Sequence, residues 1–180
     1  ISALNFTFKK GRFNYMETIL ALCSSLAAVI ALLFALLTAL KVSKQSEGTE
    51  KMKSISASIR KGANAYLKRQ YKIVIIFFII MFLVLGGMAI AKLLTPFVPF
   101  AFLTGGIFSA LSGFIGMKIA TIANSRTANA CQEGLNKGLR VAFSAGSVMG
   151  FTVVGLGLFD ISFWFIILKF IFKLSPSDIT

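Results

Sequence analysis

Four long runs of apolar residues, separated by short basic segments, dominate the pattern along the chain. Their cores hold no charged residue apart from Asp160, and they are apolar around their whole circumference. A helix of a soluble core would keep a polar face toward water. Because a helix needs about 20 apolar residues to cross a bilayer, the pattern predicts an all-α polytopic membrane protein. We expect four transmembrane helices, at residues 16–42, 72–91, 97–117 and 141–168.

The basic residues predict how these helices are oriented. Thirteen Lys and Arg side chains lie in residues 41–72 and 118–140, whereas the short connection between the second and third runs holds only Lys92. The positive-inside rule therefore assigns segments 43–71 and 118–140 to the cytoplasm and both ends of the chain to the outside. The net charge of +13 then reflects orientation. Nucleic-acid binding is disfavoured, because no basic stretch lies on a soluble module large enough to fold alone.

The two ends differ from the rest of the sequence. Residues 1–15 show no clear period and precede Met16, and we interpret them as a non-native or upstream extension. The first apolar run is longer than the 7–15 residues of a signal-peptide core and continues into basic residues, which predicts an uncleaved span. Residues 169–180 are interpreted as a truncated end.

The first cytoplasmic segment carries a helical pattern of its own. Apolar side chains recur at spacings of three and four: Met52, Ile55, Ile59, Ala63 and Tyr66. This periodicity predicts an amphipathic helix that runs from about Thr49 into the second span. It has two interpretations. The helix is either a juxtamembrane element that sets topology and touches anionic lipid, or a docking surface for the rest of a larger protein.

Small residues and one carboxylate are the candidates for function within the membrane. Gly146 and Gly150 form a GxxxG pair in a span rich in Gly and Ser, which favours close helix packing over the alternative of a permeation path. Asp160 is the intramembrane suspect. It lies nineteen residues beyond Val141, about 28 Å at helical rise. That distance predicts an interfacial carboxylate, solvated or paired with Lys169 or Lys173.

The residue types exclude several kinds of chemistry. The chain contains no His, which excludes imidazole bases and His metal ligands. Cys23 and Cys131 are predicted to be free thiols. No P-loop, CxxC motif or paired-carboxylate spacing is present. We therefore predict no catalytic, cofactor-binding or metal-ligating residue in this chain.

Three strings add a resemblance. Residues 47–71 (EGTEKMKSISASIRKGANAYLKRQY), 102–130 (FLTGGIFSALSGFIGMKIATIANSRTANA) and 138–156 (GLRVAFSAGSVMGFTVVGL) resemble, in order, the first part of the ion-translocating membrane pyrophosphatases. The last string is similar to the GxVMGxxVVGL pattern of that family's fourth span. Asp160 departs from the family, which has a small or apolar residue there.

The resemblance implies an integral pump that couples hydrolysis of magnesium pyrophosphate to export of protons or sodium ions. It implies a two-ring bundle of about sixteen helices, a homodimer, an outward N-terminus, magnesium and in part of the family potassium as cofactors, and a bacterial inner membrane. The family's hydrolytic residues lie on later, inner-ring helices, so the four spans would be outer-ring scaffold and this chain alone inactive. The alternative is a complete four-helix membrane protein that binds lipid or a partner without catalysis.

Overall fold

The computed structural model describes the backbone of residues 2–171 and the side chains of residue 16 and residues 18–169. Four long helices follow one another: α1 (Ser2–Ser43), α2 (Glu50–Ile90), α3 (Val98–Gln132) and α4 (Leu135–Ile166). A π-helical turn, Ile167–Ile171, continues α4. Each helix contains a stretch long and apolar enough to cross a membrane. The predicted all-α architecture with four membrane-length helices is confirmed.

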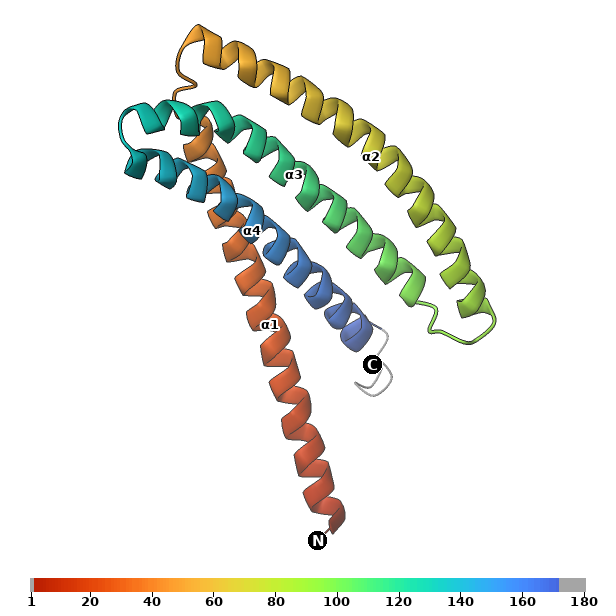
Figure 1. Ribbon diagram of the computed structural model, residues 1–180. Helices are drawn as coiled ribbons and strands as arrows, with labels where there is room; N and C mark the ends of the chain where they lie inside the picture. Colours follow the sequence, from red (N-terminus) through yellow and green to blue (C-terminus); the bar gives the residue numbers. More distant parts are fainter. Residues whose placement is uncertain (1, 172–180) are drawn as a thin grey trace.

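The helices form a row in which α3 lies between α2 and α4, and α1 packs against the other side of α4 (Figure 1). One end of the row contains the end of α1, the beginning of α2 and the turn between α3 and α4. We call this the basic end, because the segments that meet there are those rich in Lys and Arg. The opposite end carries the turn between α2 and α3, so these two helices are antiparallel neighbours.

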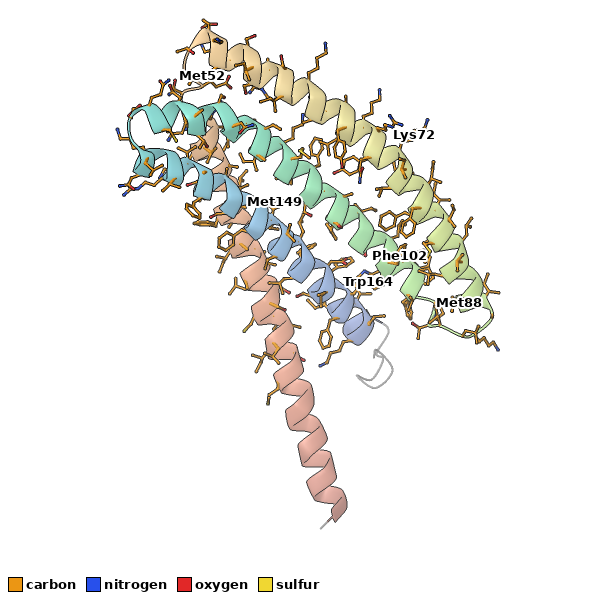
Figure 2. All side chains as sticks on the ribbon, in the orientation of Figure 1. Met52, Lys72, Met88, Phe102, Met149 and Trp164 are labelled. Atoms are coloured by element: carbon orange, nitrogen blue, oxygen red, sulfur yellow. The ribbon has the colours of Figure 1, made fainter. Side chains whose placement is uncertain are left out.

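The helix α2 extends far beyond its apolar run. It begins where the sequence predicts, with Thr49 as N-cap, whose hydroxyl accepts from the Met52 amide at 3.4 Å. Its 41 residues give a length of roughly 60 Å at helical rise, twice the ~30 Å hydrocarbon layer. Lys72 lies about midway between Met52 and Met88, near the two ends of the helix (Figure 2). About half of α2 therefore lies outside its apolar run, and we call this part the projecting half of α2.

The prediction of a loop at residues 118–140 is wrong. The helix α3 continues to Gln132, and only Glu133 and Gly134 separate it from α4. The helix persists because its inner face stays packed beyond the apolar run: Ile119 and Ala123 are buried beside Val148 of α4. Gly134 makes the tight turn with φ +138°, a conformation that favours glycine. The segment is a helical hairpin.

The packing face of α2 also differs from the predicted apolar stripe. Ile55 and Tyr66 are more than half exposed, whereas Ser56 and Leu67 are buried. The true contact stripe is thus rotated by about one residue from the apolar one. A small serine allows α2 to approach α3 closely, and this steric fit outweighs side-chain hydropathy at the contact.

Glycines contribute to the packing, but not the pair that was expected to. A side chain at Gly155 would meet Leu32 and the carbonyl of Ala28 on α1, and one at Gly138 would meet Cys131. A Cβ atom added at Gly146 or Gly150 would have no described neighbour within 4 Å. The expectation that the GxxxG pair packs two of these helices together is therefore wrong within the described bundle. Cys23 and Cys131 are free thiols, as predicted.

Candidate functional site

The basic end contains an ion-pair cluster centred on Glu47, in the connection between α1 and α2. The Arg60 guanidinium donates two parallel hydrogen bonds to its carboxylate, Nη1–Oε1 at 3.0 Å and Nη2–Oε2 at 3.1 Å. Arg126 of α3 approaches the same carboxylate, with Nη1 2.9 Å from Oε1. Bidentate guanidinium–carboxylate pairing is among the stronger polar contacts. We call Glu47, Arg60 and Arg126 the Glu47 clasp.

Arg126 also holds the end of α1. Its Nε donates to the carbonyl of Gln45 at 3.0 Å, and its Nη2 donates to the carbonyl of Ser43 at 3.0 Å. The last carbonyls of a helix lack intrahelical partners and carry partial negative charge that favours a cation. Arg126 is only 9% exposed, so these contacts are made largely away from water. One side chain thus joins α1, the α1–α2 connection and α3.

Further contacts close the clasp region. Gly48 has φ +84° and lies so close to Met52 and to Asn129 of α3 that a side chain there would collide with both. Farther along α2, Ser125 donates to Ser56 at 3.3 Å in a buried contact. Lys118 donates to Asn64 at 2.7 Å. The projecting half of α2 is therefore fixed along α3 by polar groups.

The clasp makes stability depend on pH. The hydrogen bond from Arg60, together with the charges of Arg60 and Arg126, holds the pKa of Glu47 below its ordinary 4.5 against the opposing effect of desolvation. Since the folded-state pKa is the lower one, this contribution is fully present above about 4.5 and is lost as the pH falls through the folded-state value. We expect thermal unfolding scans in detergent from pH 7 to pH 3 to show a steeper loss of stability below pH 4.5 for the wild type than for Glu47→Gln. Parallel pH profiles would contradict this assignment.

Asp160 lies inside the apolar layer and not at its surface. Its Oδ2 would be 3.3 Å from a side chain at Gly105 of α3, which is the eighth residue of a helix that begins at Val98. That is about 10 Å from the end of α3 at helical rise. The neighbouring Phe159 ring packs edge-on against Phe108, 5.8 Å away. The prediction of an interfacial, solvated carboxylate is wrong. The first turns of α4 lie outside the apolar layer, on its basic side, so Asp160 comes earlier in the crossing than a count from Val141 implies.

The expected partners of Asp160 are placed elsewhere or lie outside the described residues. The Oδ1 atom is enclosed and has no hydrogen-bond partner among the described residues. Lys169 donates to Thr18 at 2.9 Å and lies over the Phe165 ring. Lys173 lies outside the described residues. Asp160 is thus a carboxylate within the apolar layer, with one oxygen shielded by the packing of α3 on α4.

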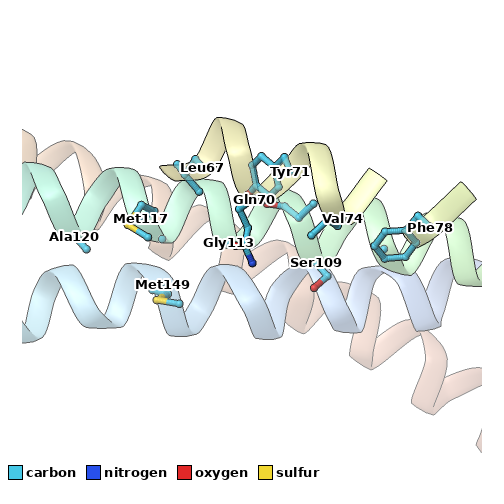
Figure 3. A pocket seen from close by; sticks show the side chains of 13 residues that line it. Leu67, Gln70, Tyr71, Val74, Phe78, Ser109, Gly113, Met117, Ala120 and Met149 are labelled. Carbon is cyan, nitrogen blue, oxygen red and sulfur yellow. Dashed lines mark hydrogen bonds between the residues drawn. The ribbon is translucent and has the colours of Figure 1, made fainter. Parts of the chain in front are cut away.

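A groove of about 470 Å³ lies between α2 and α3 (Figure 3). Small residues of α3 form one wall, among them Ser109 and Gly113, and Met149 of α4 closes one side. The Tyr71 hydroxyl donates to the carbonyl of Ala110 at 2.6 Å and bridges the two helices. No Asp, Glu, Lys or Arg side chain lines the groove. It can accept an apolar chain or another helix, but its lining offers no charged group to an ion.

The described acids do not fit a magnesium site. Glu47 is neutralised by two arginines, Glu50 pairs with Lys53, and Glu133 pairs with Lys137. The Oδ1 atom of Asp160 has no hydrogen-bond partner among the described residues. Among the residues with described side chains, no group of three His, Cys, Asp or Glu lies close enough to hold a metal ion. No hydrolytic step can be derived from this part of the chain.

The clasp was not identified from the sequence, although one signal was present. Arg126 is the one charged residue in the last fourteen residues of α3, from Ile119 to Gln132. An arginine on the inner face of an otherwise small and apolar helix needs a buried partner. Glu47 is one of only six acids in the chain. Their pairing across 79 residues follows from the fold and from no local motif.

Residues 29–178 match the protein-family model described as inorganic H+ pyrophosphatase. The match covers most of the chain and includes α2, α3 and α4 entirely. The chain belongs to this family. The family identified from the three strings is thereby confirmed.

Curated relatives agree with the family assignment. A protein of Bacteroides thetaiotaomicron named "Putative K(+)-stimulated pyrophosphate-energized sodium pump" is 52% identical over 155 residues, which cover 86% of this chain and 21% of the relative. The "K(+)-insensitive pyrophosphate-energized proton pump" of Methanosarcina mazei is 41% identical over 147 residues, 79% of this chain and 21% of the relative. A proton pump of the same description from Moorella thermoacetica is 40% identical over 136 residues, 74% of this chain and 19% of the relative. The chain thus spans about a fifth of the length of these relatives.

Proposed function

We propose that this chain is part of a pyrophosphate-energized ion pump that couples hydrolysis of magnesium pyrophosphate to transport of protons or sodium ions. The observation that carries the proposal is the family match over residues 29–178, joined to 52% identity with a relative named as a pyrophosphate-energized sodium pump. The relatives are named as both sodium and proton pumps. The proposal therefore leaves the ion unassigned.

Within such a pump we assign the four helices to an outer scaffold. The assignment is supported by the polar groups of the described region, whose acids are held by basic side chains at the basic end or enclosed between helices. Magnesium, potassium and the substrate would then bind to residues outside this chain. In the same proposal the pump is a homodimer in a bacterial inner membrane, and its basic end faces the cytoplasm.

A chimera tests this assignment. The aligned segment of the Bacteroides thetaiotaomicron relative is replaced by the present chain, and magnesium-dependent pyrophosphate hydrolysis and ion uptake are measured in membrane vesicles. We expect the chimera to retain both activities, because a scaffold of the same family preserves the geometry of a catalytic centre located elsewhere. The unmodified relative serves as the reference for protein amount and activity.

Two outcomes have opposite meanings for the proposal. A chimera that accumulates in the membrane to the level of the relative and hydrolyses pyrophosphate supports the scaffold role. A chimera that accumulates equally well and yet lacks hydrolysis contradicts it, because the exchanged segment would then supply more than support. A matched chimera with Gly150→Ala, at an open position of α4, controls for the effect of any single substitution.

A further inference from the structure

A second groove, of about 480 Å³, runs along the contact between α2 and α3 and adjoins the groove of Figure 3, with which it shares Tyr71 and Phe78. Its lining extends along α2 from Tyr71 to Leu83 and along α3 from Leu103 to Ala110. The only side-chain polar group in that lining is the Tyr71 hydroxyl, which already donates to Ala110. The groove therefore suits a hydrocarbon chain and gives a polar ligand or an ordered water no free side-chain partner.

The length and depth of this groove match one leaflet of a bilayer. The thirteen residues from Tyr71 to Leu83 span twelve helical rises, about 18 Å, and half of the ~30 Å hydrocarbon layer is ~15 Å. The groove begins where the apolar run of α2 begins and continues toward its middle. A single acyl chain lying in it would have its headgroup at the end marked by Tyr71, on the basic side.

Lysines of α2 stand at that end on the same stripe as the groove wall. Lys68 and Lys72 precede Ile75 and Ile79 at spacings of four, three and four, which place all four side chains on one face of a helix. Ile75 and Ile79 line the groove, so the two lysines continue the same helix face past the Tyr71 end of the groove; neither is part of the lining itself, and we call this region its mouth. Both are exposed, and neither forms a salt bridge with a described acid.

A third lysine reaches the mouth from α3. Lys118 places its Nζ 5.5 Å from the centre of the Phe114 ring and donates to Asn64 of α2. These contacts hold the ammonium group beside Asn64, which precedes Lys68 by one helical turn on the same face of α2. Its positive charge is not neutralised by a described carboxylate. The mouth thus combines three positive charges with an apolar floor.

We infer that an anionic phospholipid binds between α2 and α3, with its phosphate headgroup at Lys68, Lys72 and Lys118 and one acyl chain in the groove. Basic groups at this depth attract the anionic lipids of the cytoplasmic leaflet. Another helix covering the groove would fill the apolar floor, but it would compensate the lysines only if it also carried acids at their level. The inference does not depend on the pump activity and would stand if that proposal failed.

Native mass spectrometry of the purified chain tests the site. The chain is incubated in detergent with equal amounts of phosphatidylglycerol and phosphatidylcholine of the same acyl composition. We expect one phosphatidylglycerol to be retained in preference. Lys68→Gln with Lys72→Gln should weaken its binding about 25-fold, since each lysine contributes about fivefold. The matched control Lys44→Gln with Lys51→Gln removes two exposed lysines that lie away from the groove and should leave binding within about twofold.

A groove-filling variant separates the acyl chain from the charges. Ile79→Trp keeps the charge of the mouth and reduces the space in the apolar floor, so retention of phosphatidylglycerol should fall at least tenfold. Equal retention of the two lipids, or equal weakening by the two double variants, would overturn the inference. So would unchanged binding by Ile79→Trp. If a longer protein containing this chain retained no lipid here, the groove would be assigned to another helix and the inference would be wrong.

Discussion

Replacing Arg126 with alanine is expected to lower the free energy of unfolding by about 3 kcal/mol, the lower part of the range for removing one partner of a buried ion pair. The lower part applies because Glu47 keeps its bidentate contact with Arg60. The variant also leaves the carbonyls of Ser43 and Gln45 without their donor. Unfolding by SDS titration in mixed micelles, followed by circular dichroism, measures the change.

Two variants make the Arg126 result specific. Arg126→Lys keeps the positive charge but cannot make the guanidinium contacts to several acceptors, so an intermediate loss is expected. Arg60→Ala removes a side chain that is 32% exposed, and its loss should be about 1 kcal/mol because solvent screens the pair. Equal losses for Arg60→Ala and Arg126→Ala would contradict the role of Arg126 as the residue that joins three segments.

Replacing Gly155 with leucine is expected to separate α1 from α4 and to lower the free energy of unfolding by about 3 kcal/mol, the upper part of the range for overpacking. Any side chain at this position would come within 2.9 Å of Leu32 and 3.3 Å of the carbonyl of Ala28. The Leu32 side chain can rotate away, but the Ala28 carbonyl belongs to the backbone of α1 and can move only if the helix moves. The same SDS titration measures the effect.

Gly150→Leu is the matched control for Gly155→Leu. Both glycines lie on α4, five residues apart, and a Cβ atom added at Gly150 would meet no described atom within 4 Å. Leucine is also the better helix former by just under 1 kcal/mol, so this variant should be neutral or slightly stabilising. If Gly150→Leu were as destabilising as Gly155→Leu, the α1–α4 contact would not be the cause of the loss.

The four spans and the start of α2 could be predicted because their causes are local. Apolar runs of membrane length have one stable environment, and Thr49 followed by Glu50 is a recognisable helix start. The continuation of α3 through Asn124 and Ser125 could not be predicted in the same way. Such residues favour turns by local hydrogen bonding, and only packing of Ile119 and Ala123 against other helices outweighs that preference.

The clasp and the depth of Asp160 depended on tertiary structure. Thirteen basic residues lie in segments 41–72 and 118–140, and although Arg126 is alone in an otherwise small and apolar stretch, no local motif identifies Glu47 as its partner. A count of residues from Val141 places Asp160 at the surface only if the membrane begins at Val141. Gly116, near the end of the apolar run of α3, lies against Met149 of α4. The residue of α4 at the membrane boundary is therefore near position 149 and not at Val141. Moving the start of the count by these two helical turns moves Asp160 from the membrane surface into the apolar layer.

Pyrophosphate hydrolysis by the 180-residue chain alone tests the central claim most directly. The purified chain, reconstituted in liposomes with magnesium and potassium, is assayed for phosphate release beside the complete Bacteroides thetaiotaomicron relative. A scaffold whose acids are held by arginines and lysines or enclosed between helices predicts no release above empty liposomes. Magnesium-dependent phosphate release that is lost when single residues of this chain are substituted would contradict the scaffold role. A hydrolytic centre would then lie among the chain's own residues.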